Sequence, residues 1–545
     1  MAFLDLERID RSDCVVLLGL TALGIALAYS AWSWANVPII DDWVYVWSVD
    51  HLIETGKLRV LEWSAHYPIV QVLWGALFSL VFGFSFGILR VSTLVVAWLG
   101  LLAFYLTLRE MEIRPLAAAV GTLVLLCNPV LFMLSNSFMT DVPFVSIMNG
   151  ALLFYVRWTK RGKTRDLLFG SALTTAGFLI RQLGAALAII PIGYLLLTHY
   201  LGPRRGRLPV LQHVSLLVPF VGFGVTEWWI HAVHGETRIY HEKLELLQFV
   251  WSTSSWIYVR ELLRAVLQLG LVLWPLAMAI VNRLQGRALA YATGIVALLC
   301  GLSIFHWGEL PNPLQAILSL NELGMGRKLI AGTIPDRSLI AWHGVLAFGI
   351  SVSGAVVIVA ALVNGARQWN RWVQGPATIL LFNALCQLLL LEVLWLFYDR
   401  YYLPLLPGAC ALLACHLVPM KRAIVVALVG ALSWGAVAVT GTIDMFRFLV
   451  AVASARNWLL QHGVGSDDID AGYALNGWYL YAPSPSLSAG GEEPDVPFIT
   501  SNRQSPYKIA NAPEPDYRIV QQLNWPVLWA VTNTVYILKH SVKDR

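Results

Sequence analysis

Charged residues are scarce in this chain of 545 residues. Asp, Glu, Lys and Arg make up 13% of the sequence, whereas soluble proteins carry about 25%. Hydrophobic residues reach 57%, and the mean hydropathy is +0.64. Apolar runs of about 20 residues recur along the chain, which is the length that crosses a bilayer as a helix. A soluble fold is therefore excluded, and the sequence predicts a polytopic helical membrane protein.

Cysteine is also rare, and its pattern indicates no disulfide framework. The six cysteines lie in apolar segments, and no two of them form a C-x-x-C pair. Small buried side chains are the simplest interpretation. The polar residues 1–13 lack a small-residue cleavage signal, which predicts that the first apolar run is retained as a span. The net charge of +5 is spread over loops, so no nucleic-acid partner is expected.

The predicted fold class is an all-α polytopic membrane protein with about 13 transmembrane helices. The excess of Trp and Tyr fits aromatic belts at the two membrane surfaces. We expect a transmembrane domain over 1–443, with its first outer loop at 35–87. The expected spans are 14–34, 89–108, 116–134, 142–156, 167–180, 183–197, 209–230, 265–281, 288–305, 339–363, 376–397, 402–418 and 423–442.

The apolar run 68–86 decides the topology. If it spans, the basic loop 157–165 falls on the same side as the Asp41 loop; if it lies in the interface, the two fall on opposite sides. We prefer the interfacial interpretation, because the run is short, begins at a proline and is rich in Gly and aromatic residues. The positive-inside rule then places the basic loops and the N-terminus in the cytoplasm and Asp41 outside, in the plasma (inner) membrane.

A change of composition marks the last 100 or so residues. Residues 444–545 are polar, with Pro and Gly clusters, a helical pattern at 445–462 and a strand-like run at 527–540. We expect a small extracytoplasmic α/β domain there. The long loop 306–337 is rich in Pro and Gly and is predicted to be a mobile lid.

Four ionisable features converge on the predicted outer face. They are the pair Asp41/Asp42, Asp141, Arg181 and Arg400. Charges at a membrane boundary are costly and usually functional. Two arginines there suit the phosphate of an anionic lipid, which guanidinium groups grip bidentately. Carboxylates nearby suit a base for a hydroxyl acceptor, or ligands for a divalent metal ion.

Each of these residues also has a structural interpretation. Asp41/Asp42 and Asp141 precede predicted helices, where Asp is a favourable cap. Arg181 could extend its guanidinium to the membrane surface. Arg400 could form an ion pair with Asp399, and His66 could be an ordinary histidine at the interface. His231, His234 and His241 have metal-like spacing, but solvated loop residues are the favoured interpretation.

The ordered set of motifs resembles a known superfamily. A first span, an acidic pair, interfacial helices entered through Tyr67-Pro68, the Met139–Pro143 motif MTDVP and the Asp399–Pro407 motif DRYYLPLLP are together similar to the C-type (GT-C) membrane glycosyltransferases. The likeness is greatest to the branch of the protein O-mannosyltransferases and the lipid A aminoarabinose transferase. It covers residues 14–197 and, more locally, 381–407.

The resemblance implies a polyprenyl-phosphate sugar donor, inversion at the anomeric carbon and an aspartate in the first outer loop as base. That role falls on Asp41, with Asp42 where relatives often have Glu. Asp141 matches the second-loop acid, and Arg400, with Arg181 and Tyr401, would bind the donor phosphate. His66 lies where aminoarabinose transferases have a lysine before Pro-Pro, and this chain lacks that lysine.

The sequence therefore predicts an integral membrane glycosyltransferase that moves a sugar from the lipid carrier to a hydroxyl of a glycan, lipid or protein acceptor. No motif in the sequence requires a cofactor, and a divalent metal ion is a possible one. Two alternatives remain. A transporter or flippase would need polar groups near the midplane and matched halves, and a non-catalytic subunit with a binding tail would not need the acidic pair.

Overall fold

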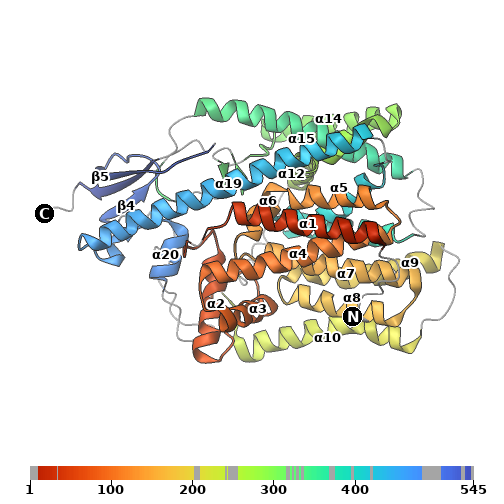
Figure 1. Ribbon diagram of the computed structural model, residues 1–545, viewed down its shortest axis with the longest axis horizontal. Helices are drawn as coiled ribbons and strands as arrows, with labels where there is room; N and C mark the ends of the chain where they lie inside the picture. Colours follow the sequence, from red (N-terminus) through yellow and green to blue (C-terminus); the bar gives the residue numbers. More distant parts are fainter. Residues whose placement is uncertain are drawn as a thin grey trace.

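A computed structural model shows long helices side by side in a bundle, with a small sheet domain projecting at one end (Figure 1). The structure describes residues 10–33, 35–201, 209–237, 239, 242, 256–314, 319–321, 324–326, 330–332, 337–366, 375–394, 398–417, 421–481, 505–528 and 534–541.

Each expected span is occupied by a helix or by consecutive helical segments. The first seven are α1 (Arg11–Ser30), α4 (Phe86–Glu110), α5 (Pro115–Leu126) with α6 (Pro129–Ser135), α7 (Asp141–Arg161), α8 (Thr164–Phe178), α9 (Ala185–Leu201) and α10 (Val210–Trp229), which continues as η3 (Ile230–His234). The others are α12 (Trp256–Val272) with α13 (Trp274–Ile280) and η4 (Val281–Arg283), α14 (Gly286–Trp307), α15 (Arg337–Ala366), α17 (Ala377–Leu394), η5 (Asp399–Leu405) with α18 (Leu406–Ala414), and α19 (Lys421–Gln461).

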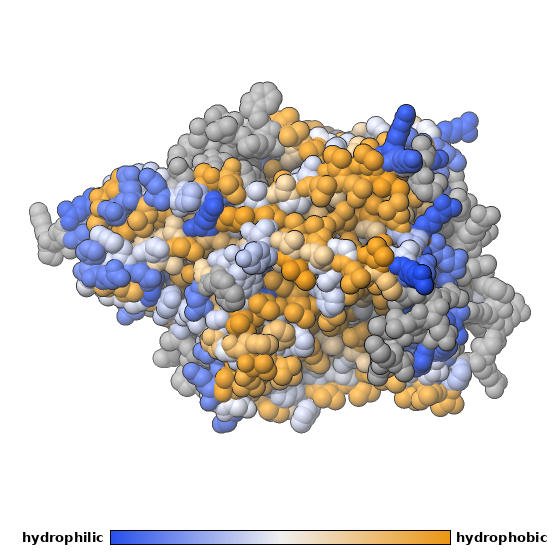
Figure 2. Space-filling view, in the orientation of Figure 1, coloured by the Kyte–Doolittle hydropathy of each residue, from blue (hydrophilic) through white to orange (hydrophobic). Residues whose placement is uncertain are grey.

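Six helices of the described chain are long and apolar enough to cross a membrane, and eight if two bent pairs are each one span. The α5–α6 pair bends by 65° and the α12–α13 pair by 78°. Pro129 starts α6 and Pro275 lies in the first turn of α13, where proline fits because it has no N–H to donate. Figure 2 shows hydrophobic side chains across the middle of the bundle and hydrophilic ones towards its two ends. The prediction of an integral membrane protein is confirmed.

The first outer loop stays at one end of the bundle. Its helices α2 (Asp42–Thr55) and α3 (Ile69–Phe82) lie across the bundle axis, near the C-terminal domain (Figure 1). At the start of α4, the Phe86 N–H donates to Asn36 Oδ1 at 2.9 Å. At the end of α4, Glu110 accepts from Arg157 at 3.0 Å. The run 68–86 therefore does not cross the bundle, and the basic loop lies at the end opposite Asp41.

The C-terminal region combines a helix with a four-stranded sheet. Its elements are β3 (Ile469–Asp470), α20 (Tyr473–Leu480), β4 (Tyr507–Ala510), β5 (Tyr517–Asn524) and β6 (Thr534–His540), after a short 3-10 turn η6 (Ser466–Asp468). The strand order is β3-β4-β6-β5, with only the β3–β4 pair parallel. Ile509 and Ile537 face each other in the register and pack with Val452 of α19. The expected α/β region is confirmed.

Helix α19 differs from the expectation of a span followed by a separate helix. It is continuous over 41 residues, so the predicted boundary at 443/444 lies inside it. The polar Thr442 and Asp444, which suggested an end, are both buried in the helix. The Asp444 carboxylate accepts the N–H of Leu528 at 2.8 Å, which ties the sheet domain to the helix. The division into 1–443 and 444–545 stays a prediction.

The predicted lid lies partly outside the described residues. Its described part contains a short hairpin of β1 (Leu320–Asn321) and β2 (Gly324–Met325). The Asp399 carboxylate accepts the N–H groups of Ser319 and Leu320 at 2.9 and 2.8 Å. This part of the loop is therefore fastened directly to the DRYY motif. Most of 238–255, which includes His241, also lies outside the described residues.

Candidate active site

Asp41 is held by two side chains that come from the far half of the sequence. Its Oδ2 accepts from Arg400 Nη2 at 3.0 Å, and its Oδ1 accepts from the Tyr473 hydroxyl at 2.8 Å. Asp41 occupies the N-cap position of α2, but its side chain makes no capping hydrogen bond. The carboxylate keeps 24% exposure in this setting. It is oriented on both oxygens and still reachable, as a proton acceptor must be.

Tyr473 of α20 brings the C-terminal region into the site. Its hydroxyl oxygen accepts from Trp63 Nε1 at 2.9 Å while its proton goes to Asp41. Burial, followed by the Asp41 carboxylate, raises the pKa of Tyr473 well above its usual value. The hydroxyl therefore remains a donor at any physiological pH. Sequence analysis missed this residue, because 432 positions separate it from Asp41 and no motif surrounds it.

The backbone in front of Asp41 is strained and clamped. Ile40 has φ of 54°, in the left-handed region, which costs a β-branched residue about 1–3 kcal/mol. Such strain persists only where surrounding contacts impose it. Arg90 of α4 holds the chain just before Ile40. Its guanidinium, in a side chain only 1% exposed, donates to the carbonyls of Ala35, at 2.7 Å, and of Val37. The sequence did not single out this arginine either, because it is an isolated charged residue within an apolar segment.

Asp42 has a different environment from its neighbour. It is fully buried, and its two oxygens accept the backbone N–H groups of Ile39, at 2.6 Å, and Phe138, at 3.4 Å. These bonds join the first and second outer loops. Burial raises the pKa of Asp42 to about 7, against the opposing effect of Arg90. The structure thus separates the acidic pair: Asp41 faces the site and Asp42 faces the backbone that carries it.

Asp141 and Arg181 form a second ion pair at the same end of the bundle. The guanidinium of Arg181 donates to the Asp141 carboxylate, and both side chains are at most 4% exposed. Neither helix capping nor snorkelling describes this arrangement, because the Asp141 side chain does not cap α7 and Arg181 is buried. The Arg181-Gln182 turn is sheltered inside the protein, as expected from the short spans on either side of it.

Tyr401 connects the two ion pairs. The Arg181 guanidinium lies 4.9 Å from the centre of its ring and that of Arg400 lies 5.4 Å away. Cations at this distance from an aromatic ring are attracted by its electron-rich face. Asp399 does not pair with the Arg400 guanidinium; it accepts the Arg400 backbone N–H instead. The structure therefore brings Asp41, Arg400, Tyr401, Arg181 and Asp141 together.

His66 lies beside this cluster. Its Nδ1 is 3.0 Å from the Gln182 side-chain oxygen, directly after Arg181 in sequence. His231 is paired with acidic side chains, and His234 Nε2 accepts from the backbone N–H of Val60. In the described part of the chain no three His, Cys, Asp or Glu residues are grouped as metal ligands. The carboxylates of Asp41 and Asp141 are each engaged by an arginine, so this donor set does not fit a divalent ion.

An apolar cavity begins next to the cluster. It has a volume of about 610 Å³ and lies between α1, α4, α5, α6, α7 and the start of α18. Val142, next to Asp141, and Leu403, two residues after Tyr401, are in its wall. A second apolar cavity of about 490 Å³ lies on the other side of α18, against α12, α15 and α17. Hydrocarbon chains therefore have room on both sides of the segment that carries Arg400 and Tyr401.

Comparison with known proteins gives one family match and several structural ones. Residues 66–229 match the family model described as dolichyl-phosphate-mannose-protein mannosyltransferase. No curated protein sequence matches the chain. Among solved structures, the Saccharomyces cerevisiae Pmt1–Pmt2 O-mannosyltransferase complex, bound to its sugar donor, is 16% identical, with 39% of this chain and 33% of that chain covered and a TM-score of 0.34.

Two longer structural matches are also low in identity. ArnT from Cupriavidus metallidurans bound to undecaprenyl phosphate is 15% identical, with 85% of this chain and 82% of that chain covered and a TM-score of 0.40. The oligosaccharyltransferase AglB from Archaeoglobus fulgidus, in complex with an inhibitory peptide and a dolichol-phosphate, is 13% identical, with 88% and 61% covered and a TM-score of 0.44. This chain thus spans one third of the yeast chain and three fifths of AglB.

The family match covers a defined part of the site. Residues 66–229 contain His66, Asp141 and Arg181, whereas Asp41, Arg400 and Tyr473 lie outside the matched segment. The resemblance to the protein O-mannosyltransferase branch of the C-type membrane glycosyltransferases, predicted from the motifs, is thereby confirmed over residues 66–229.

Proposed function

We propose that this chain transfers a sugar from a polyprenyl-phosphate carrier to an acceptor hydroxyl on the extracytoplasmic side of the membrane. One observation carries the proposal. A partly exposed carboxylate, Asp41, is oriented by Arg400 and Tyr473, and Arg400 shares the ring of Tyr401 with a second buried arginine, Arg181. A base and two guanidinium groups within one cluster suit acceptor activation and phosphate departure in the same step.

Asp41 acts as the general base in this reaction. It takes the proton of the acceptor hydroxyl while that oxygen attacks the anomeric carbon of the donor. The bond between the anomeric carbon and the phosphate oxygen breaks, and its electron pair leaves with the polyprenyl phosphate. A single displacement of this kind inverts the anomeric configuration. A positioned general base contributes about 10²–10⁴-fold to such a step, and Tyr473 keeps the carboxylate in place for it.

Arg400 and Arg181 stabilise the charge that develops on the leaving phosphate. Guanidinium groups match phosphate oxygens in geometry and remain charged. Both are buried in the cluster, where they are more effective than in water. Tyr401 holds the two cations close together despite their mutual repulsion. The apolar cavity that begins at Val142 and Leu403 then takes the first part of the polyprenyl chain.

Asp42 supports Asp41 and does not itself take part in the chemistry. Both its oxygens are used on the backbone of the two outer loops. His66, through Gln182, keeps the Arg181 turn in place at the edge of the site. The acceptor, whether glycan, lipid or protein, approaches Asp41 from the aqueous side.

A transfer assay tests this function. Purified full-length protein is incubated with radiolabelled sugars carried on polyprenyl phosphate, or with the matching nucleotide sugars, together with a membrane extract as acceptor. We expect label to move from the lipid-linked donor alone, with inverted configuration in the product. Transfer from nucleotide sugars, or retained configuration, would contradict the proposal. Movement of intact donor across a vesicle membrane without cleavage would support a flippase instead.

A further inference from the structure

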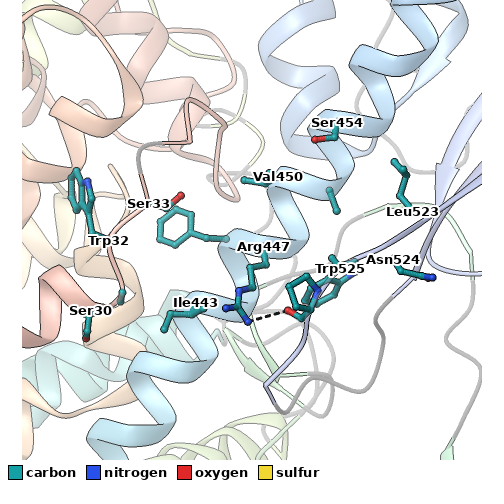
Figure 3. Close-up of a pocket in the computed structure, with 14 residues that line it drawn as sticks. Ser30, Trp32, Ser33, Ile443, Arg447, Val450, Ser454, Leu523, Asn524 and Trp525 are labelled. Carbon is teal, nitrogen blue, oxygen red and sulfur yellow. Dashed lines mark hydrogen bonds between the residues drawn. The ribbon is translucent and has the colours of Figure 1, made fainter.

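A cavity of about 560 Å³ lies where the membrane bundle meets the C-terminal domain, away from the residues of the active site. It is formed by the end of α1, the middle of α19 and the end of β5 (Figure 3). Its polar and aromatic lining residues are Ser30, Trp32, Ser33, Phe446, Arg447, Ser454, Asn524 and Trp525. Neither the predicted reaction nor the cluster around Asp41 makes use of these side chains.

Arg447 is the cation of this cavity, and none of the described residues that line it is acidic. It is half-buried, and its Nη1 donates to the carbonyl of Pro526 at 3.1 Å (Figure 3). Among the described residues the guanidinium makes no ion pair, in contrast to Arg181 and Arg400. A guanidinium has five N–H donors, so most of the donors of Arg447 are available to an anion in the cavity.

The cavity is placed at the boundary of the membrane. Helix α1 ends at Ser30, and Tyr29 in its last turn is 82% exposed. Tryptophan and tyrosine side chains concentrate at the level of lipid headgroups, which agrees with Trp32 and Trp525 in the wall. Ile443 and Val450 add an apolar side to the same cavity. An occupant with a charged head and an apolar body fits this combination of groups.

We propose that the cavity binds the phosphate headgroup of an anionic membrane lipid, with Arg447 as its principal ligand. Arginine recognises phosphate through paired N–H donors, and anionic lipids attract cations at the membrane surface. Asn524 and Ser33 supply hydrogen bonds to the headgroup, and the acyl chains continue along Ile443. This binding site does not depend on which reaction the protein catalyses.

The cavity is also connected to the loop that carries Asp41. Phe446 is in the cavity wall, and the Arg90 guanidinium lies 4.8 Å from the centre of its ring. Arg90 in turn holds the carbonyls of Ala35 and Val37. A lipid in the cavity would therefore contact the ring on which Arg90, the arginine that holds this loop, packs.

Native mass spectrometry of the full-length protein tests the binding site. Wild-type protein is titrated with phosphatidylglycerol and with phosphatidylcholine of the same acyl chains. We expect one phosphatidylglycerol to bind in preference to phosphatidylcholine, and Arg447→Gln to weaken that binding at least about tenfold. Arg518→Gln, on the exposed side of β5 outside the cavity, is the matched control and binds like wild type.

A second variant leaves the charge in place. Ser454→Trp adds an indole to the exposed cavity-lining turn of α19 and fills the cavity, so it is expected to exclude the lipid. Unchanged phosphatidylglycerol binding in Arg447→Gln or in Ser454→Trp would overturn the proposal, and so would equal binding of the two lipids. Displacement of the lipid by equimolar glycerol 3-phosphate would also overturn it, because the site would then recognise a soluble phosphate ester.

Discussion

Asp41 and Asp42 are adjacent residues of the same type, but they have different environments and roles in this protein. The carboxylate of Asp41 accepts hydrogen bonds from Arg400 and Tyr473 and remains accessible. Asp42 is fully buried against backbone amides. A helix turns by about 100° per residue, so consecutive side chains point in different directions. Sequence alone identifies the pair but assigns no separate roles to its members.

The burial of Asp42 should make the stability of the protein depend on pH. The pKa of Asp42 is 3.8 in an unfolded chain and about 7 when folded, so the folded state holds the proton more tightly. The cost of burying the charge therefore appears as the pH rises above about 4 and is complete above about 7. We expect Asp42→Asn to be less stable than wild type at pH 5, and the difference to narrow by pH 8.

Thermal unfolding of purified protein at the two pH values measures this difference. Asp467→Asn is the control, because Asp467 is exposed in the turn η6 and makes neither of the two backbone bonds. Parallel changes of wild type and Asp42→Asn with pH would contradict the assigned environment.

Tyr473→Phe is expected to lower kcat while the protein remains folded. The variant keeps the ring but loses the hydroxyl that donates to Asp41 and accepts from Trp63. A hydrogen bond to a charged group contributes about 1.5–3 kcal/mol, so a loss of about 10–100-fold follows if the bond positions the base. Steady-state transfer kinetics provide the measurement.

Tyr479→Phe is the matched control, on the same helix. The ring of Tyr479 packs on the guanidinium of Arg456, and removing the Tyr479 hydroxyl leaves that contact in place. Equal kcat values for wild type and Tyr473→Phe would show that the tyrosine does not position Asp41.

At the level of elements, α20 and α2 pack closely enough that one methyl group should disturb the site. A Cβ on Gly477 of α20 would overlap the indole of Trp43 in α2, which is 1% exposed. Overpacking of this kind costs about 1–3 kcal/mol. We expect Gly477→Ala to move Tyr473 away from Asp41, with transfer activity reduced about tenfold or more.

Gly294→Ala in α14 is the control, since a Cβ there meets nothing within 4 Å. Transfer activity and the unfolding midpoint are compared for both variants. An active Gly477→Ala protein would indicate that α20 is free to shift without consequence for the site.

The elements also show what a single sequence is able to predict. The interfacial run 68–86 and the sheltered Arg181 turn followed from segment length and the cost of charge in a membrane, and the structure agrees with both. The continuity of α19 could not be predicted, because Thr442 donates to the carbonyl of Ala438 within the helix and Asp444 accepts from the remote Leu528. Tyr473 and Arg90 were missed for the same reason: their partners are remote in sequence, and no local pattern marks them.

For the whole molecule, the two ends of the bundle differ in chemistry. Helices α2, α3 and α20 and the sheet domain share one end of the bundle (Figure 1). The ion pairs of Glu110 with Arg157 and Arg161 join the opposite ends of α4 and α7. The positive-inside rule places the second end in the cytoplasm. The structure fixes which residues share an end, and the side of the membrane on which each end lies stays a prediction.

Cysteine labelling tests that orientation. In a variant without native cysteines, Asp467→Cys at the sheet domain should react with a membrane-impermeant maleimide in intact cells. Lys163→Cys, exposed at the opposite end, should react only after the membrane is opened. The reverse pattern would place Asp41 on the cytoplasmic side and remove an extracytoplasmic acceptor from the account.

The most direct test of the central claim measures sugar transfer from a labelled polyprenyl-phosphate sugar by Asp41→Asn. Wild type and Asp50→Asn are measured in the same assay as controls. The amide keeps the size of the side chain but cannot take the acceptor proton, so we predict that product formation falls at least about 10²-fold. Donor binding and the unfolding midpoint should stay near those of wild type and of the Asp50→Asn control. Transfer by Asp41→Asn at the rate of wild type would contradict the role of Asp41 as the base.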